Sequence, residues 1–392
     1  MGFVLYAAHL FTIFGIALSN TFFGLTLLWC GLHFRRFKQS WPRQAAILIP
    51  LAAYSIGLVI SVLFSSDFSV SSRHLREILS LTTLVLGLFL VRGAVETRRI
   101  YSLIILTTNL VAIYGICQYF LSDYGELTNR IPGPFSHYMT LSGVLLIGDF
   151  LLLARMAVGD GWRNPWSWVS LVLINGCLHL SLTRGAWVAA TLTITALLIL
   201  RGRRFFKVYA VVLLLTAVFA AFGPDAWRDR LMSIGDLRDI SIYDRLCMVD
   251  AATYMISERP LFGVGPGIVD ARYPIYRHPT APRYTVPHLH NTFLELAAER
   301  GTVSLLAYLA LMLLAMIAAL RAYRAEGGAG GPRADLYLGV LLAVIGFNLN
   351  GLFEDNWRDT EIQRLILFLL AVPYILGHGT REESPNPPES DP

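Results

Sequence analysis

The segment at residues 287–301, PHLHNTFLELAAERG, joins a polar stretch of roughly sixty residues to a further apolar run. It carries two histidines, an asparagine and two glutamates. Most of the chain on either side of the polar stretch is apolar enough to cross a bilayer. The segment is therefore predicted to lie where a membrane meets water, a place where lipid-borne and water-soluble groups can both reach polar side chains.

The composition is that of a polytopic membrane protein. Hydrophobic residues make up 55% of the 392 residues and charged residues only 15%, which lies outside the range of soluble globular domains. The net charge of +5 does not indicate nucleic acid as a partner, because the cations are spread over alternate loops. The first apolar run, 2–29, has no small-residue cleavage site after a short apolar core and is predicted to be retained in the membrane.

Runs of about twenty apolar residues predict the membrane spans. The N-terminal run supplies one span, or two if it breaks at the polar pair Ser19-Asn20. With that break the chain is predicted to be all-α, with about twelve transmembrane helices. The other ten runs lie near 45–64, 76–92, 99–121, 135–157, 166–183, 184–201, 206–222, 302–321, 335–353 and 361–377.

Positive charges assign the loops to the two sides of the membrane, since short cytoplasmic loops are enriched in Lys and Arg. If the N-terminal run is a single span, the chain has eleven spans, and its N-terminus must lie outside to keep the same loops cytoplasmic. The charges therefore determine on which side each loop lies, but they do not determine the number of spans. The predicted inner loops carry Arg35, Arg36, Lys38, Arg43, Arg92, Arg98, Arg99, Arg155, Arg163, Arg201, Arg203, Arg204, Lys207, Arg321, Arg324 and Arg333. The short outer loops carry only Arg73, Arg76, Arg130, Arg184 and Arg358.

This topology divides the chain into four parts. Residues 1–222 hold the first nine spans, and 223–289 form one large loop on the outer face, whose length exempts it from the charge rule. Residues 290–378 hold the last three spans. The remainder, 379–392, is charged and Pro-rich and is predicted to be a disordered cytoplasmic tail.

Arg184 stands at the outer start of the predicted eighth span, directly after Thr183. Thr183 can cap that helix, which leaves backbone amides and the positive end of the helix dipole facing outward. An arginine at such a helix end forms a site suited to phosphate. The alternative is an arginine that only reaches the interface and binds lipid headgroups.

The large loop is predicted to contain an amphipathic helix over 242–256, which can lie on the membrane surface or cap the bundle. Arg245 would then face the mouth of the bundle and share a diphosphate with Arg184. The alternative is a solvated Arg245 paired with a neighbouring aspartate. The apolar stripe is predicted to consist of Ile242, Leu246, Val249, Ala252 or Thr253, and Ile256.

His290 stands where the helix after the polar stretch begins. Neutral imidazole is a suitable general base near pH 7, and a helix N-terminus disfavours the charged form. Asn291 and Glu295 lie four residues apart on one helix face, so Asn291 can orient a sugar or phosphate while Glu295 buries a partnered charge. His288 is a supporting candidate, and the alternative for both histidines is an interface position without chemistry.

No metal or nucleotide cofactor is predicted. His288 and His290 could ligate zinc, but no further His, Cys or Asp follows at ligand spacing, and prolines separate the pair from His278. Nucleotide-binding and nucleophile-elbow motifs are absent from the sequence. Asp149 lies within an apolar run and is expected to face a polar partner such as Asn109 or Asn175; a transporter path through Asp149, Asn109 and Asn348 is the alternative.

These residues together resemble the bacterial O-antigen ligase family, in a superfamily shared with O-antigen polymerases and O-linked oligosaccharyltransferases. The resemblance rests on SLTRGAW at 181–187, on the loop helix before PLFGVGPG at 260–267, and on the spacing of His290 and Gly301. The resemblance in sequence extends from about residue 183 to residue 352. Before residue 183 only the predicted arrangement of spans resembles that of the family. Val188 and Ser304 depart from the family pattern, and the chain lacks the longer C-terminal portion of the oligosaccharyltransferases.

The resemblance implies an inner-membrane glycosyltransferase of lipopolysaccharide biosynthesis with a periplasmic active site. The enzyme would move a glycan from undecaprenyl diphosphate to a sugar hydroxyl of lipid A-core, without metal, and with inversion. His290 would be the base, and Arg184 and Arg245 would bind the diphosphate. His288, Asn291, Glu295 and Gly301 would support the site. A polymerase would use the same donor and a second lipid-linked glycan as acceptor.

Overall fold

The computed structural model describes residues 1–35, 46–124, 129–158, 161–201, 205–236 and 238–382. All regular elements within these ranges are helices, which confirms the predicted all-α class. The α-helices are α1 (Gly2–Phe11), α2 (Ile16–Leu32), α4 (Leu48–Leu63), α5 (Phe68–Ser72), α6 (Glu77–Leu90), α7 (Gly93–Leu121), α8 (Tyr138–Ala157), α9 (Pro165–Leu180), α10 (Arg184–Arg201), α11 (Phe206–Phe222), α12 (Asp225–Met232), α13 (Ile240–Glu258), α14 (Val269–Tyr276), α15 (Thr292–Ala325), α16 (Ala334–Asn350) and α17 (Thr360–Glu382).

Four of the described helices are long and apolar enough to cross a membrane: α7, α8, α15 and α17. α11 and α12 would make a fifth span if counted together, although the chain bends by 116° between them. The predicted count of twelve spans is therefore not reached by helix length. Each of the ten predicted runs after the N-terminal one does contain a helix, but the apolar residues continue into the turns, so several helices are shorter than their runs.

The N-terminal run forms two short helices, α1 and α2, that pack against each other as a hairpin. A side chain at Gly2 would meet the ring of Trp29, which brings the start of α1 beside the end of α2. The break lies at Gly15, whose backbone is extended, and not at the predicted Ser19-Asn20 pair. Ser19 is buried within α2 and donates its hydroxyl to the carbonyl of His9, so its polarity is satisfied without interrupting the helix.

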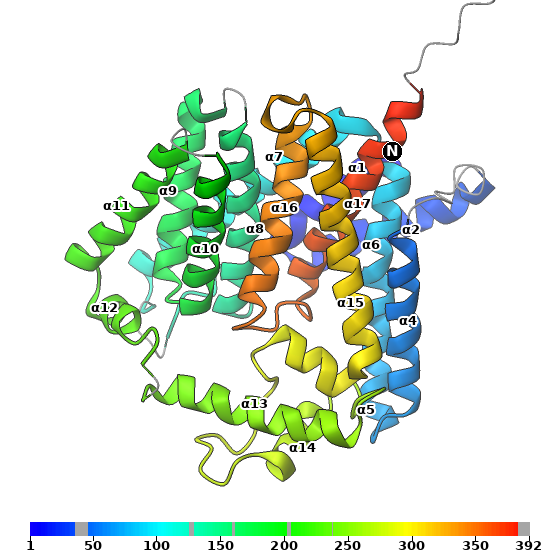
Figure 1. The fold of residues 1–392 in the computed structure, drawn as a ribbon, viewed down its shortest axis with the longest axis vertical. Helices are drawn as coiled ribbons and strands as arrows, with labels where there is room; N and C mark the ends of the chain where they lie inside the picture. The colour runs from blue at the N-terminus through cyan, green and yellow to red at the C-terminus, as the bar shows by residue number, and fades with distance from the viewer. Residues whose placement is uncertain (36–45, 125–128, 159–160, 202–204, 237, 383–392) are drawn as a thin grey trace, which may run out of the picture.

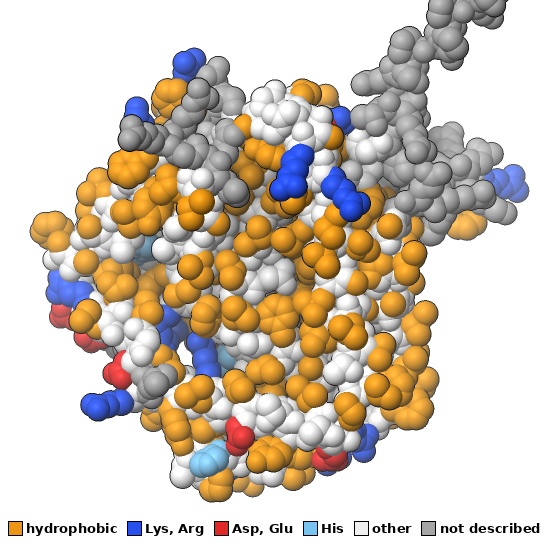
Figure 2. All heavy atoms as spheres, in the orientation of Figure 1, with side chains coloured by type: hydrophobic (Ala, Val, Ile, Leu, Met, Phe, Trp, Pro, Cys, Tyr) orange, Lys and Arg blue, Asp and Glu red, His pale blue; other side chains and the backbone are white. Residues whose placement is uncertain are grey.

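The N-terminus and the end of α17 lie at one end of the bundle, and α12, α13 and α14 lie at the other (Figure 1). Ion pairing joins the predicted inner loops at the first end, where Arg98 binds Asp335 with a distance of 2.9 Å. In Figure 2 a broad hydrophobic area covers the middle of the visible face, while most of its Asp and Glu side chains lie in the lower part. This is the layered surface expected of a protein that spans a membrane.

α13 crosses the end of the bundle and packs on its own small core (Figure 1). The predicted loop helix is present. Two residues of its predicted apolar stripe, Leu246 and Val249, are 50% and 40% exposed, so this stripe does not face the small core. That the stripe lies on the membrane surface stays a prediction. Apolar side chains thus occur on both faces of α13, and those of the opposite face pack on the loop segments that follow. The buried face consists of Asp244, Cys247, Met248, Ala251, Ala252 and Met255.

Gly301 divides α15 into a short first part, which contacts the loop core, and a long second part. Its φ of 77° and ψ of 172° are outside the helical region and favour glycine. A side chain there would collide with the backbone of Leu261 and Phe262. The glycine therefore allows the segment that carries the predicted site to turn and pack closely on the residues after α13.

The last helix is longer than predicted. α17 continues to Glu382, so the first residues of the predicted disordered tail, 379–392, are helical. The rest of that prediction, at 383–392, lies outside the described residues, as do the predicted inner-loop cations at 36–45 and 202–204.

Candidate active site

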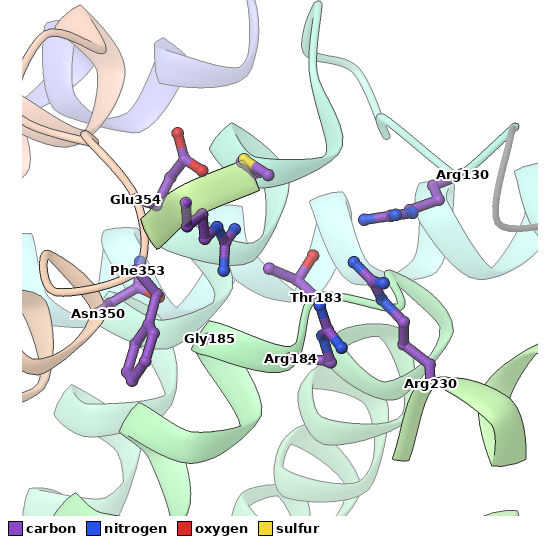
Figure 3. Close-up of a pocket in the computed structure, with 10 residues that line it drawn as sticks. Arg130, Thr183, Arg184, Gly185, Arg230, Asn350, Phe353 and Glu354 are labelled. Carbon is purple, nitrogen blue, oxygen red and sulfur yellow. The ribbon is translucent and has the colours of Figure 1, made fainter. Parts of the chain in front are cut away.

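A pocket rich in arginine lies between the bundle and the layer formed by α12 and α13. Four guanidinium groups and one carboxylate contribute to its walls. In Figure 3, Arg130 and Arg230 lie near Thr183, and Glu354 lies across the pocket from them. The lining residues are Arg130, Met139, Thr183, Arg184, Gly185, Arg230, Arg245, Asn350, Phe353 and Glu354.

Arg184, the first residue of α10, is buried and held by the loop that leads to α13. Its guanidinium donates to the carbonyl and hydroxyl of Ser233 at 3.0 and 2.6 Å, and to Asp239 at 3.1 Å and Ser241 at 2.5 Å. Burial raises the pKa of Asp239, but the hydrogen bonds from Ser241 and Arg184 outweigh it and lower that pKa to about 2. Arg184 therefore connects two elements in addition to contributing charge to the pocket.

Arg245 projects from α13 into the same pocket. Among the described residues it donates no hydrogen bond, and burial lowers the pKa of its guanidinium while Glu354 opposes that shift. The neighbouring Asp244 forms an ion pair with Arg283, so the alternative pairing of Arg245 with that aspartate does not occur. Arg245 keeps donors available for an anion.

Two further pocket arginines were not predicted as site residues. Arg130 precedes α8 and lies 4.4 Å from the ring centre of Tyr138, and Arg230 on α12 donates to the carbonyl of Leu182 at 3.4 Å. Burial lowers the pKa of Arg130, and the charge of Arg184 adds to the effect. In the sequence, Arg130 and Arg230 are only single arginines in two separate outer segments. Nothing in the sequence indicates that the fold brings the two side chains into one pocket.

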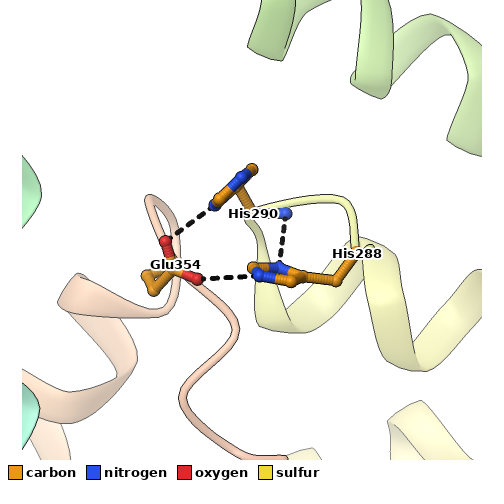
Figure 4. A group of neighbouring side chains, drawn as sticks. All are labelled: His288, His290 and Glu354. Carbon is orange, nitrogen blue, oxygen red and sulfur yellow. Dashed lines mark hydrogen bonds and ion pairs between the residues drawn. The ribbon is translucent and has the colours of Figure 1, made fainter. Parts of the chain in front are cut away.

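His290 and His288 both contact Glu354, which lies in the turn between α16 and α17 (Figure 4). Nδ1 of His290 is 2.8 Å from one carboxylate oxygen, and Nε2 of His288 is 3.5 Å from the other. Glu354 was not predicted, because only the fold brings it to the histidines. Its carboxylate, which lines the arginine pocket, joins the two groups of residues into one site.

The hydrogen bonds assign different tasks to the two histidines. The backbone N–H of His290 donates to Nδ1 of His288 at 3.3 Å, so the other nitrogen of His288 carries the proton that faces Glu354. His290 presents its own Nδ1–H to Glu354, because a carboxylate only accepts. In neutral His290 the second nitrogen, Nε2, is then an acceptor that can take a proton from a substrate.

Burial would raise the pKa of Glu354, but the hydrogen bond from His290 and the influence of both histidines lower it to about 2. Burial lowers the pKa of His288 to about 3, although the Glu354 carboxylate opposes that shift. At neutral pH the site thus combines a carboxylate with an uncharged His288. The carboxylate can orient the ring of His290 and stabilise positive charge that forms on it.

The remaining predicted residues support the histidine loop. Asn291 caps α15, since its Oδ1 accepts from the amides of Phe293 and Leu294 at 3.0 Å. Its Nδ2 donates to the carbonyl of Leu352 at 3.1 Å, and a role in orienting substrate stays a prediction. Glu295 is buried, accepts from the backbone N–H of Leu289 at 2.7 Å and pairs with Arg358 at 3.3 Å, in agreement with the prediction of a partnered charge. These contacts hold the loop from both sides.

His288, His290 and Glu354 also present ligand atoms within 4.8 Å of one another, a set that could hold a metal ion. Two imidazoles and one carboxylate are suitable zinc ligands. In the observed arrangement, the direct bond between His290 and Glu354 uses one ligand atom from each residue.

Asp149 lies far from this chemistry. It is buried in α8 and accepts a hydrogen bond of 3.0 Å from Asn175, which was one of its two predicted partners. Asn348 accepts from Tyr308 at 2.9 Å. The polar residues proposed for a transporter path are thus engaged within the helical bundle.

The fold and site define a helical, multi-pass membrane protein with a charged candidate active site at one end of its bundle. Residues 169–309 match the family model described as O-antigen ligase, so the predicted resemblance is confirmed over this range. This domain is shared by O-antigen ligases and polymerases, which indicates a role of the ligase or polymerase type in glycan transfer. A search of curated proteins gave no match.

Proposed function

We propose that this protein is an O-antigen ligase, which moves a glycan from undecaprenyl diphosphate to a sugar hydroxyl of lipid A-core in lipopolysaccharide biosynthesis. The proposal rests on one arrangement: a pocket of four arginines that shares Glu354 with the histidine pair. The arginines suit an anionic leaving group, and the histidine suits a hydroxyl nucleophile.

The donor diphosphate binds to the arginine pocket in this proposal. Guanidinium groups bind phosphate oxygens in a planar fork and keep their charge at any physiological pH. Arg184 is positioned by four hydrogen bonds, while Arg245 keeps its donors available. Fixed positive charge of this kind stabilises the negative charge that forms on the diphosphate as it leaves.

His290 accepts the proton of the acceptor hydroxyl at Nε2. The hydroxyl oxygen then forms a bond with the anomeric carbon, while the bond from that carbon to the diphosphate oxygen breaks and its electron pair leaves with the diphosphate. A single displacement inverts the anomeric configuration. Glu354 holds the imidazole in the required tautomer and stabilises the imidazolium. Asn291, Glu295 and Gly301 shape the loop that carries the base.

The membrane arrangement follows from the same proposal. The hairpin of α1 and α2, together with the ten helices that match the later apolar runs, constitutes twelve crossings of the bacterial inner membrane. Residues 223–289 and the active site face the periplasm, and exposed apolar residues of α13, such as Leu246, contact the membrane surface. Surrounding lipids and the two lipid-linked substrates are the expected partners.

A reconstituted assay tests this function and its closest alternative. Purified protein in liposomes should transfer a glycan from undecaprenyl diphosphate to lipid A-core. Transfer to a second carrier-linked glycan instead would identify a polymerase. In cells, loss of a ligase leaves carrier-linked polymer accumulated, whereas loss of a polymerase leaves no polymer, and ordinary surface glycan would contradict both assignments.

The reaction needs no metal in this proposal. EDTA or added zinc should therefore leave the rate of transfer unchanged. A several-fold change in rate would instead assign a metal ion to His288, His290 and Glu354.

A further inference from the structure

A second polar cleft, with a volume of about 680 Å³, lies on the other side of the histidine loop. It is formed by α2, the turn Arg73–Arg76 with the start of α6, the first part of α15, and the segment from Asp355 into α17. None of the residues assigned to the arginine pocket lines it. The cleft is therefore a separate cavity of the same protein.

The charges of this cleft are balanced, in contrast to those of the arginine pocket. Its walls include four carboxylates, four guanidinium groups and one imidazole. Arg300 pairs with Glu77 at 2.7 Å, and Glu299 accepts from the backbone N–H of Gly267 at 2.7 Å. A mixture of strong donors and acceptors suits a ligand rich in hydroxyl groups, since each hydroxyl can both donate and accept.

Some polar atoms of the cleft have no protein partner among the described residues. Oδ1 of Asp355 and Nε of Arg364 are buried without a hydrogen bond, and both side chains are 5% exposed. Buried polar groups are normally paired, because a buried donor or acceptor without a hydrogen bond destabilises the fold. Both residues line the cleft, so unpaired polar groups lie in its wall.

The wall of the cleft is the back of the proposed catalytic loop. Glu354 lines the arginine pocket, while the next residue, Asp355, lines the cleft. Glu295 and Arg358 also line the cleft and bind the loop through the N–H of Leu289 and the carbonyl of Pro287. A ligand in the cleft thus lies against the loop that carries His290.

Part of the cleft wall, on α2 and α6, is exposed. Its exposed residues include Ile16 and Leu79, at 44% and 55% exposure, together with Asn20 and Gly24. Both helices come from apolar runs predicted to lie in the membrane, so a lipid-anchored molecule can approach the cleft from this side.

We propose that this cleft binds the sugar headgroup of the lipid-anchored acceptor, which approaches from the membrane on the side of α2 and α6. The inference rests on the proposed function for its assignment of donor and acceptor. The arginine pocket binds the diphosphate of the donor, and the balanced cleft binds part of the sugar headgroup of the acceptor. The sugar with the attacking hydroxyl then extends past the histidine loop to His290.

Direct binding tests this inference without any transfer reaction. Lipid A-core from cells that lack O-antigen is titrated into the purified full-length protein in nanodiscs, with lipid A devoid of core sugars as the comparison ligand. Lipid A-core should bind at least about tenfold more tightly than lipid A. Equal binding of the two ligands, or no binding of either, would overturn the proposal.

Two glycines on one face of α2 provide a matched pair of variants. Space is open around the Cβ position of both Gly24 and Gly31, so both tolerate a side chain, but only Gly24 lines the cleft. Gly24→Trp should raise the Kd for lipid A-core by at least about tenfold, whereas Gly31→Trp should leave it unchanged. Asp355→Asn should also weaken binding.

The two proposals fail separately. If Gly24→Trp binds lipid A-core like the wild type, the cleft is not the acceptor site, even where transfer depends on Arg245. If lipid A-core binding is lost in Gly24→Trp but the wild type transfers no glycan, the cleft is still the binding site for lipid A-core, and the ligase assignment fails.

Discussion

His290 and Glu354 are 64 residues apart in the chain, yet Nδ1 of the histidine lies 2.8 Å from Oε2 of the glutamate. The contact depends on the turn between α16 and α17 and on the start of α15. Thr292 fixes these segments to each other, because its hydroxyl donates to the carbonyl of Glu354 at 3.0 Å. The residue proposed as base is thus oriented by a segment outside the matched domain range of 169–309.

Glu354→Gln should reduce glycan transfer by roughly two to four orders of magnitude, by analogy with loss of the carboxylate that orients a catalytic histidine. Binding of the donor should change much less, because the arginines remain. The measurement is transfer and donor binding by the purified variant. Glu361→Gln is the control, since this acidic residue does not line the arginine pocket; equal losses in both variants would remove the special role of Glu354.

Arg245→Ala should lower transfer about a hundredfold or more, since one electrostatic stabiliser is lost. Arg245→Lys should restore little, because an ammonium group does not reproduce the planar fork. Arg184→Ala should show a similar loss together with a lower melting temperature, because it also removes hydrogen bonds to Ser233 and Ser241.

Kinetics and thermal melting of these variants are compared with Arg238→Ala, an exposed loop arginine that does not line the pocket. Wild-type transfer by both Arg245→Ala and Arg184→Ala would show that these arginines do not bind the diphosphate. Loss of transfer in Arg238→Ala would indicate a general effect of loop charge.

Stability should fall in acid partly because of His288. Its pKa is about 3 in the folded protein and 6.5 ordinarily, so the unfolded chain binds more protons between these values. Folding is then weakened as pH drops below 6.5, by up to ~1.4 kcal/mol per pH unit for one proton. His288→Asn should lose less stability between pH 7 and pH 5 than the wild type. Parallel melting curves for the two proteins would contradict this.

Labelling of single cysteines should place the loop and the inner ends on opposite sides of the membrane. Tyr284→Cys is in the large loop and 66% exposed in the wild type, and it should react with an impermeant reagent added to the periplasm. Ala325→Cys at the end of α15 should react only after the cells are opened. Periplasmic protection of position 284 would reverse the proposed topology. Native Cys117 is exposed and is first replaced.

The sequence identified only part of the set of residues that meet at the candidate site. Arg184, Arg245 and His290 follow motif-like spacing along one part of the chain. Arg130, Arg230 and Glu354 approach them only through the packing of distant helices, which no periodicity encodes. Glu354 also lies in a short turn after an apolar run, a position without a recognisable motif.

The fold was predicted in its class but not in its details. The apolar runs located helices, but run length overestimated helix length, since apolar residues also fill the turns. The apolar stripe predicted for α13 does not coincide with the face that packs on the small core, because apolar residues occur on both sides of this helix and their spacing does not show which side faces protein. The structure explains why a glycine follows His290 at this spacing. The backbone conformation of Gly301 and its close contacts favour glycine at that position.

The most direct test compares His290→Ala with His288→Ala in a purified system with carrier-linked donor and lipid A-core. The expected result is no detectable transfer by His290→Ala with near-normal donor binding, because a base acts on the acceptor hydroxyl and contributes little to binding the diphosphate. His288→Ala should retain part of the activity. An active His290→Ala variant beside an inactive His288→Ala variant would contradict the assignment of His290 as the base.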